Sequence, residues 1–86
     1  MHFQVVSIFD SAAGVYSRPA FVPSTGVAIR DFTDEVNRKA DDNQLSKHPE
    51  DFSLYLLAAF DDNNGVFSGD DSFPQVLVRG KDVVRV

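Results

Sequence analysis

Apolar and polar residues follow the patterns of β-strands along three segments of the chain. Segment 3–9 is rich in β-branched and aromatic residues and ends at an Asp-Ser-Ala-Ala-Gly turn. Segment 15–22 is also extended, but Pro19 has no amide hydrogen, so we expect this strand at or near a sheet edge. Segment 52–60 alternates most regularly, with even-numbered positions on one side and odd-numbered positions on the other. Because both sides are fairly apolar, we expect a central strand with a helix on one face and another covering, such as a second subunit, on the other.

One helix is predicted between the second and third of these strands. Pro23 ends the preceding strand, and Ser24 and Thr25 offer hydroxyl groups that can cap a helix. Apolar residues then recur three or four positions apart, at Ala28, Ile29, Phe32, Val36 and Ala40. The other side is charged, so the helix should lay one apolar stripe on a sheet and end near Arg38 or Lys39.

The remaining segments are predicted to be loops and shorter strands. Segment 40–50 is polar and should form a surface loop. Asn64 and Gly65 favour a hairpin turn, so 66–67 should return antiparallel to 52–60, and the tail adds a short strand or lies across a neighbour. We therefore predict an α+β fold: a small antiparallel sheet in the order β-β-α-β-β, covered on one face by a single amphipathic helix. It forms one domain over 1–86, with 69–86 as a C-terminal extension.

Length and composition exclude several classes of protein. The 86 residues include no cysteine, so a well-packed core or a partner subunit must replace the disulfides and thiolate metal sites that stabilise many small domains. No apolar run approaches the roughly 20 residues that cross a bilayer, and no signal-peptide pattern is visible. We expect a soluble intracellular protein with no membrane partner. The formal net charge of −5 disfavours non-specific coating of DNA, so any contact with nucleic acid must use a local basic cluster.

Candidate catalytic and metal-binding groups gather around His48. Glu50 and Asp51 follow it, which offers a base and two carboxylates. Neighbours in an extended loop point in different directions, so we favour a structural role in which Pro49 fixes the entry to the strand and an acid accepts hydrogen bonds from loop amides. The acidic stretch 61–65 lacks the EF-hand spacing, and no P-loop, dinucleotide-binding, nucleophile-elbow or zinc spacing is present. We predict no enzyme, no catalytic residue, no metal site and no cofactor.

Basic residues and one aromatic residue offer a candidate surface for single-stranded nucleic acid. Tyr16 could stack on a base. The cations that could hold phosphates are Arg18, Arg30, Arg38, Lys39 and Lys47. The alternative is a solvated helix face with ion pairs such as Asp34 with Arg38, spaced i to i+4, and spacing alone favours that alternative.

Three stretches resemble a known family. They are SIFDSAAGVYSRPAF from Ser7, STGVAIRDFTDEVN from Ser24 and SKHPEDFSLYLLAAFDDNNG from Ser46. Together they are similar to the small nonstructural protein of gokushovirus-type microviruses (Microviridae), the small circular single-stranded DNA phages of bacteria. The similarity runs from about 3 to 67, and the tail beyond Ser68 departs from it. The resemblance implies a phage protein in the host bacterial cytoplasm, associated with DNA in genome replication or in the switch to packaging, and it supplies no catalytic residues.

Two functions are consistent with these observations. The first is a non-enzymatic DNA-associated factor, a homodimer whose basic cluster is centred on Arg30, the matching position without a structural role. The second is a protein-interaction adaptor that binds the replication initiator or the procapsid without touching DNA, which the negative charge suits. Several bases and an exposed aromatic ring on one face would favour DNA, whereas a large apolar patch rimmed by acids would favour a protein partner.

Overall fold

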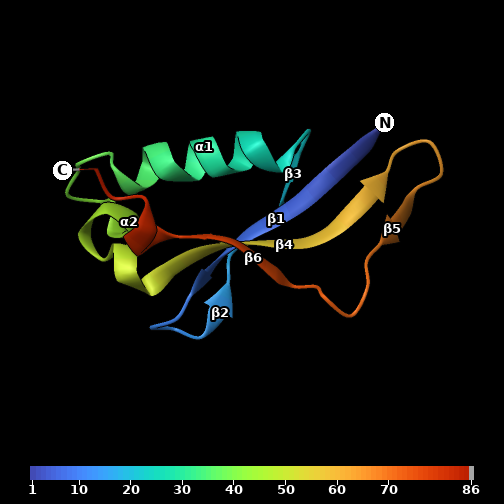
Figure 1. The fold of residues 1–86 in the computed structure, drawn as a ribbon. Coiled ribbons are helices and arrows are strands. Elements are labelled where there is room, and N and C mark those ends of the chain that lie inside the picture. Colours follow the sequence, from blue (N-terminus) through green and yellow to red (C-terminus); the bar gives the residue numbers. More distant parts are fainter. Residues whose placement is uncertain (86) are drawn as a thin grey trace.

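Two long antiparallel strands, β1 (His2–Asp10) and β4 (Phe52–Asp61), form the centre of a six-stranded sheet (Figure 1). The structure is a computed structural model and describes residues 1–85. Short strands pair with the outer sides of this central pair: β2 (Val15–Tyr16) and β3 (Ala20–Val22) with β1, and β5 (Val66–Ser68) and β6 (Gln75–Arg79) with β4. All pairings are antiparallel. The central position predicted for 52–60 is confirmed.

Each edge of the sheet is formed by two short strands instead of one continuous strand. Between β2 and β3, Ser17 continues the contact with β1, because its N–H donates to the Ile8 carbonyl at 2.8 Å and its Oγ accepts from the Ile8 N–H at 3.0 Å. Pro19 follows in the gap and has no amide hydrogen. The predicted strand 15–22 therefore lies at the edge, as expected, but is divided in two. On the other edge, the tail adds β6, the first of the two alternatives predicted for it.

Two hairpins use the same four-residue turn. Asp10 and Asp61 each end a long strand, and the Oδ1 of each accepts the backbone N–H two residues further on, at 3.0 and 2.9 Å. Gly14 and Gly65 then donate their N–H groups to the carbonyls of these two Asp residues at 2.7 and 2.8 Å. Both glycines have positive φ, 72° and 67°, which side chains other than hydrogen disfavour. The predicted return of 66–67 antiparallel to β4 is confirmed.

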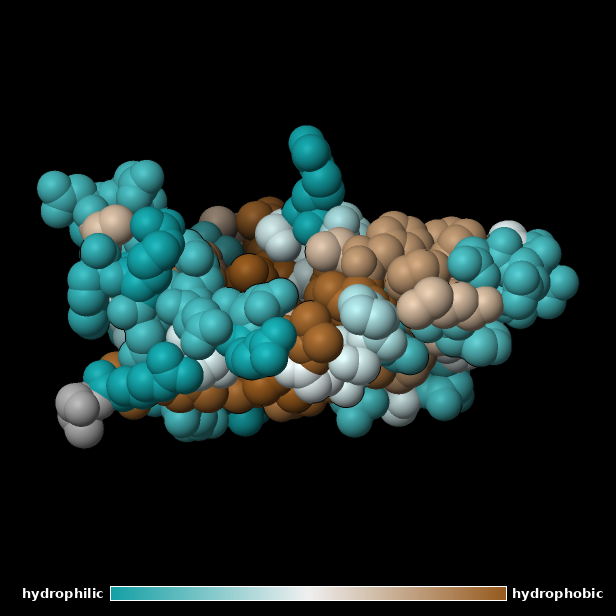
Figure 2. Space-filling view, turned by 90° about the horizontal axis from the view of Figure 1, so that it is seen from above, coloured by the Kyte–Doolittle hydropathy of each residue, from teal (hydrophilic) through white to brown (hydrophobic). Residues whose placement is uncertain are grey.

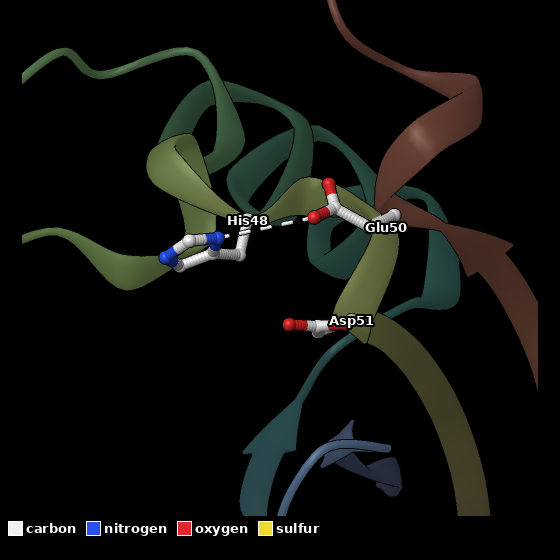
Figure 3. Close-up of side chains that lie close together, drawn as sticks. All are labelled: His48, Glu50 and Asp51. Carbon is white, nitrogen blue, oxygen red and sulfur yellow. Dashed lines mark ion pairs between the residues drawn. The ribbon is translucent and has the colours of Figure 1, made fainter.

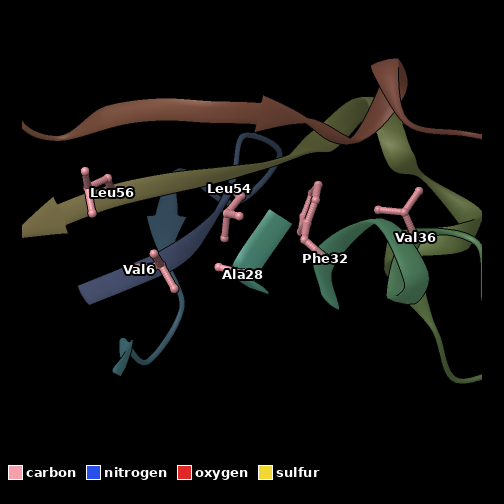
Figure 4. Packing of buried hydrophobic residues seen from close by; sticks show 6 residues of the cluster. All are labelled: Val6, Ala28, Phe32, Val36, Leu54 and Leu56. Atoms are coloured by element: carbon pink, nitrogen blue, oxygen red, sulfur yellow. The ribbon is translucent and has the colours of Figure 1, made fainter. Parts of the chain in front are cut away.

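Helix α1 (Thr25–Val36) covers one face of the sheet (Figure 1), so the predicted α+β class is confirmed. The Oγ of Ser24 caps it by accepting the Val27 N–H at 3.3 Å. The buried core between helix and sheet is formed by Val6, Ala28, Phe32, Val36, Leu54 and Leu56 (Figure 4). The helix ends at Val36, earlier than predicted. At its C-cap, the Asn37 side-chain amide donates to the carbonyls of Thr33 at 2.8 Å and Val83 at 2.9 Å, which ties the chain end to α1.

Segment 40–50 is more structured than the predicted surface loop. It contains the short helix α2 (Gln44–Lys47) and the start of a 3₁₀ turn, η1 (Pro49–Asp51); a second 3₁₀ turn, η2 (Gly80–Asp82), follows β6. Asn43, only 4% exposed, organises this region. Its Nδ2 donates to the carbonyls of Glu35 at 2.8 Å and Arg38 at 2.7 Å, and its Oδ1 accepts the Leu45 N–H at 3.2 Å. One side chain therefore forms hydrogen bonds with backbone carbonyls at the end of α1 and with a backbone N–H at the start of α2.

A β-bulge in β4 decides which side chains face the helix. Val5 pairs with Ala58 and Val6 pairs with Leu56, which leaves Leu57 as an extra residue. Leu54 and Leu56 therefore face α1, but beyond the bulge the even-numbered residues lie on the opposite face. The predicted even–odd alternation along 52–60 is wrong beyond Leu56.

Candidate nucleic-acid interface

The sheet face opposite α1 carries most of the aromatic side chains. Directly paired residues share a face and successive residues along a strand alternate. The register therefore places on this face Phe3, Phe9, Tyr16, Phe21, Tyr55, Phe60 and Phe67. These are seven of the ten phenylalanine and tyrosine residues of the chain, and we define them as the aromatic face. The other three, Phe32, Phe52 and Phe73, belong to the core on the helix side or pack against it.

Six of these rings form two clusters of three. The first cluster is Phe9, Tyr16 and Tyr55, with centroid distances of 4.7, 5.5 and 6.0 Å. The second cluster is Phe21, Phe60 and Phe67, with centroid distances of 4.8, 5.4 and 6.0 Å. These separations are in the favourable range for aromatic pairs, so the rings hold one another in place. Nevertheless Tyr16, Phe21 and Phe67 remain 43%, 50% and 58% exposed.

In the part of the chain that the structure describes, the strand positions of the aromatic face carry no carboxylate. Within residues 1–85, the acids in strands are Asp10 and Asp61, and the register places both on the helix side. Arg79 pairs with Ser53 and lies on the aromatic face. A chain with a formal charge of −5 thus keeps one broad sheet face free of strand acids.

The predicted basic residues lie mostly elsewhere. Arg30 is exposed on α1, whose buried residues face the sheet. Lys39 follows α1, and Lys47 is the last residue of α2; both are exposed. Arg38 is engaged by Glu35, with Nη2 2.7 Å from Oε1. Of the predicted nucleic-acid contacts, only Tyr16 belongs to the aromatic face.

Ion pairs on α1 differ from the predicted one. Instead of Asp34 with Arg38, the structure pairs Glu35 with Arg38, and Asp34 with Arg85 at 3.4 Å. The hydrogen bond from the Arg38 guanidinium lowers the pKa of the Glu35 carboxyl and raises the pKa of Arg38. Arg38 is therefore less available to a phosphate group than its exposure alone suggests.

A comparison with protein-family models identifies the family of the chain. The family model described as "Phage ORF5 protein" matches residues 3–83. The chain belongs to this Phage ORF5 family. It is therefore a phage protein, which confirms that part of the resemblance, and the match extends beyond residue 67 to include β6. No curated protein and no solved structure matches it.

An apolar groove of about 240 Å³ lies beside α1 in this Phage ORF5 family member. Its apolar lining comes from Val6, Ile8, Val22, Ala28, Phe32 and Leu54, with Arg18, Asp31 and Glu35 among its polar residues. The view from the helix side shows brown apolar atoms between hydrophilic groups along the middle of the molecule (Figure 2). Arg18 and the acidic residues Asp31 and Glu35 of α1 therefore line the same groove on the helix side of the sheet.

His48, Glu50 and Asp51 come together at η1 (Figure 3). His48 Nδ1 lies 3.8 Å from Glu50 Oε1, and the side chains are 54% and 61% exposed. The turn is joined to the β1–β2 hairpin through backbone, since the Asp51 carbonyl accepts the Ser11 N–H at 2.8 Å and the Ser11 Oγ–H at 3.1 Å. Within residues 1–85 these bonds use the backbone of Asp51, whereas we expected an acidic side chain to accept them.

Among the described residues, no helix is long and apolar enough to span a membrane.

Proposed function

We propose that this phage protein is a non-enzymatic factor that binds single-stranded nucleic acid on the aromatic face. It would act in the host bacterial cytoplasm, in replication of a single-stranded genome of the gokushovirus type or in the switch to packaging. One observation carries the proposal: seven aromatic side chains share the sheet face that α1 leaves uncovered, and no strand carboxylate accompanies them within residues 1–85.

Base stacking supplies the affinity in this proposal. Stacking of a base on an aromatic side chain contributes about 1–3 kcal/mol per base and tolerates any sequence. The three exposed rings, Tyr16, Phe21 and Phe67, come from both clusters. Duplex DNA keeps its bases stacked inside the helix, so the face should prefer single strands.

Charge sets the expected dependence on salt. The absence of strand acids allows a phosphate chain to approach an otherwise acidic protein, and Arg79 offers one cation on the face. For single strands the slope of log K against log salt is about −0.7 per neutralised phosphate. We therefore expect a shallow slope of roughly −1, because stacking rather than phosphate contact dominates.

Fluorescence anisotropy of labelled oligo(dT), and of a duplex of equal length, tests this proposal across a salt series. Tyr16→Ser and Phe67→Ser should each weaken single-strand binding about 5- to 150-fold, the equivalent of one stacked base. Val15→Ser and Val66→Ser are matched controls, since both residues are exposed neighbours that the register places on the other face. Absence of binding at low salt and high protein concentration would contradict the proposal, as would equal effects of the control variants.

Arg30→Ala separates the aromatic face from the helix surface predicted from the sequence. If Arg30→Ala weakens binding while Tyr16→Ser does not, the interface lies on α1 and the aromatic face has another role. The proposal expects the reverse result, because Arg30 lies on the helix and not on the uncovered sheet face.

A protein-interaction adaptor is the second candidate function. Two observations favour it. The exposed aromatic surface would suit an apolar partner, and among the described residues its strand positions carry one base, Arg79, where several were expected for a DNA-binding face. That partner would be the replication initiator, the procapsid or a second copy forming the predicted homodimer. Light scattering with size-exclusion chromatography across protein concentrations tests the second copy. A dimer that Phe67→Ser dissociates, together with no DNA binding, would assign the face to protein.

A further inference from the structure

We propose that His48, Glu50 and Asp51 form a binding site for a divalent transition-metal ion such as Zn²⁺. From the sequence we expected a structural role for these three residues, because neighbours in an extended loop point in different directions. In the structure Glu50 and Asp51 lie in the 3₁₀ turn η1 and His48 directly precedes it, and the three side chains extend to the same side of that turn (Figure 3). The site is separate from the aromatic face and does not depend on nucleic-acid binding.

The distances suit one ion. The ligating atoms of the three side chains all lie within 4.8 Å of one another, and the His48 Nδ1 to Glu50 Oε1 distance is 3.8 Å. Bonds from Zn²⁺ to imidazole nitrogen and carboxylate oxygen are about 2.0–2.2 Å, so two ligands of a tetrahedral ion are about 3.4 Å apart. Small rotations of the exposed His48 and Glu50 side chains and of the half-buried Asp51 side chain would close the difference.

The backbone beneath the three side chains is held from both sides. The Asp51 N–H donates to the His48 carbonyl at 3.0 Å, and Ser11 binds the Asp51 carbonyl. On the other side Gly80 packs so closely that a Cβ there would lie 2.3 Å from the Pro49 carbonyl oxygen. Because the fold already fixes this turn, a metal ion would order only side-chain rotamers.

The side chains are also free of competing partners. Among residues 1–85, no lysine or arginine forms an ion pair with Glu50 or Asp51, and the contact with Glu50 is the one ion pair of His48. One imidazole and two carboxylates match the preferences of first-row transition metals, whereas Mg²⁺ and Ca²⁺ prefer oxygen ligands throughout. Three protein ligands leave at least one coordination position for water.

The two histidines of the chain provide the readout. NMR spectra of the imidazole groups would be recorded while ZnCl₂ is added to the untagged, EDTA-treated full chain. We expect the His48 resonances to change saturably at one ion per chain, with those of His2 unchanged. His2 lies outside the three-residue ligand group found among the described residues. A tenfold excess of MgCl₂ should not reverse the change.

Variants give the affinity test. Glu50→Gln and Asp51→Asn keep the size of each side chain and should weaken Zn²⁺ binding at least about tenfold. Asp42→Asn, an exposed acid outside the cluster, should leave the affinity unchanged. Backbone amide spectra confirm that each variant is folded. Parallel, non-saturating changes at both histidines, or wild-type affinity in both carboxylate variants, would overturn the proposal, whatever the result of the DNA experiments.

Discussion

Removing the Asn43 side chain should destabilise the protein strongly, because this residue joins α1 to α2. Asn43→Ala deletes the two donors to the carbonyls of Glu35 and Arg38 and the acceptor for the Leu45 N–H. At about 0.5–1.5 kcal/mol net for each bond, the loss amounts to about 2–4 kcal/mol. A domain of this length has a free energy of unfolding of roughly 4–13 kcal/mol, so the melting temperature should fall by roughly 10–30 °C.

A second substitution distinguishes the two roles of Asn43, which caps the start of α2 and donates hydrogen bonds to carbonyls at the end of α1. Aspartate is as good a helix N-cap as asparagine, so Asn43→Asp would be neutral if capping α2 were the whole role. Its carboxylate cannot donate, however, and would face the carbonyl oxygens of Glu35 and Arg38 in a buried place. We therefore expect Asn43→Asp to be at least as destabilising as Asn43→Ala.

Urea unfolding followed by circular dichroism at 222 nm measures both effects. Asn63→Ala is the matched control, since Asn63 lies exposed in the β4–β5 turn and makes no side-chain hydrogen bond among the described residues. The free energy of unfolding of Asn63→Ala should stay within about 0.5 kcal/mol of the wild-type value. The reasoning is refuted if Asn43→Ala does the same, or if Asn43→Asp unfolds at the wild-type urea concentration.

Two further predictions concern glycine packing and acid stability. Gly80→Ala places a Cβ 2.3 Å from the Pro49 carbonyl oxygen, so it should lower the free energy of unfolding by about 1–3 kcal/mol. Gly26→Ala in α1 meets no atom nearer than 3.9 Å and should raise the free energy of unfolding by about 0.5–1 kcal/mol. A higher melting temperature for Gly80→Ala than for Gly26→Ala would contradict this prediction. Hydrogen bonds from groups two residues further on lower the pKa of Asp61 and Asp70 below the ordinary 3.8, so their stabilisation is present above that pH and is lost as the pH falls through the lowered values. The melting temperature should therefore fall below about pH 4, less steeply in Asp61→Asn, which keeps an acceptor; a melting temperature constant down to pH 2 would disprove the assignment.

Local rules predicted the elements whose signals lie within a few residues. The Ser24 cap and the spacing of Ala28, Phe32 and Val36 predicted α1, because a cap marks where a helix begins and buried residues recur every three or four positions along one helix face. The Asp-x-x-x-Gly pattern that begins at Asp10 recurs at Asp61, and each copy forms the same turn. Such features depend on neighbours in sequence, so they can be inferred from it.

Features that depend on contacts between distant segments were missed. The bulge at Leu57 exists because β4 must match β1, and apolar spacing within one strand does not reveal the extra residue. Asn43 reads as an ordinary loop residue, and only the return of the chain against α1 makes it a buried cap. The same reason explains why segment 40–50 was predicted to lack helix.

The candidate site was predicted only in part. Tyr16 was identified, but the aromatic face combines residues from five strands, and the register that unites them, including the bulge, is a tertiary property. The basic residues were grouped by their nearness in sequence. The structure places Arg30 on the helix and Arg79, which was not among the candidates, on the aromatic face.

Tyrosine fluorescence tests the central claim most directly. The chain has two tyrosines and no tryptophan, and Tyr16 and Tyr55 both lie in the first aromatic cluster, so the emission of the unmodified protein reports on the aromatic face alone. Oligo(dT) would be titrated into the protein at low salt, with free N-acetyltyrosinamide correcting for light absorbed by DNA. The account predicts saturable quenching by the single strand, weaker quenching by duplex at equal nucleotide concentration, and a curve shifted to higher DNA concentration in Phe67→Ser. Emission that stays constant as oligo(dT) is added would contradict it.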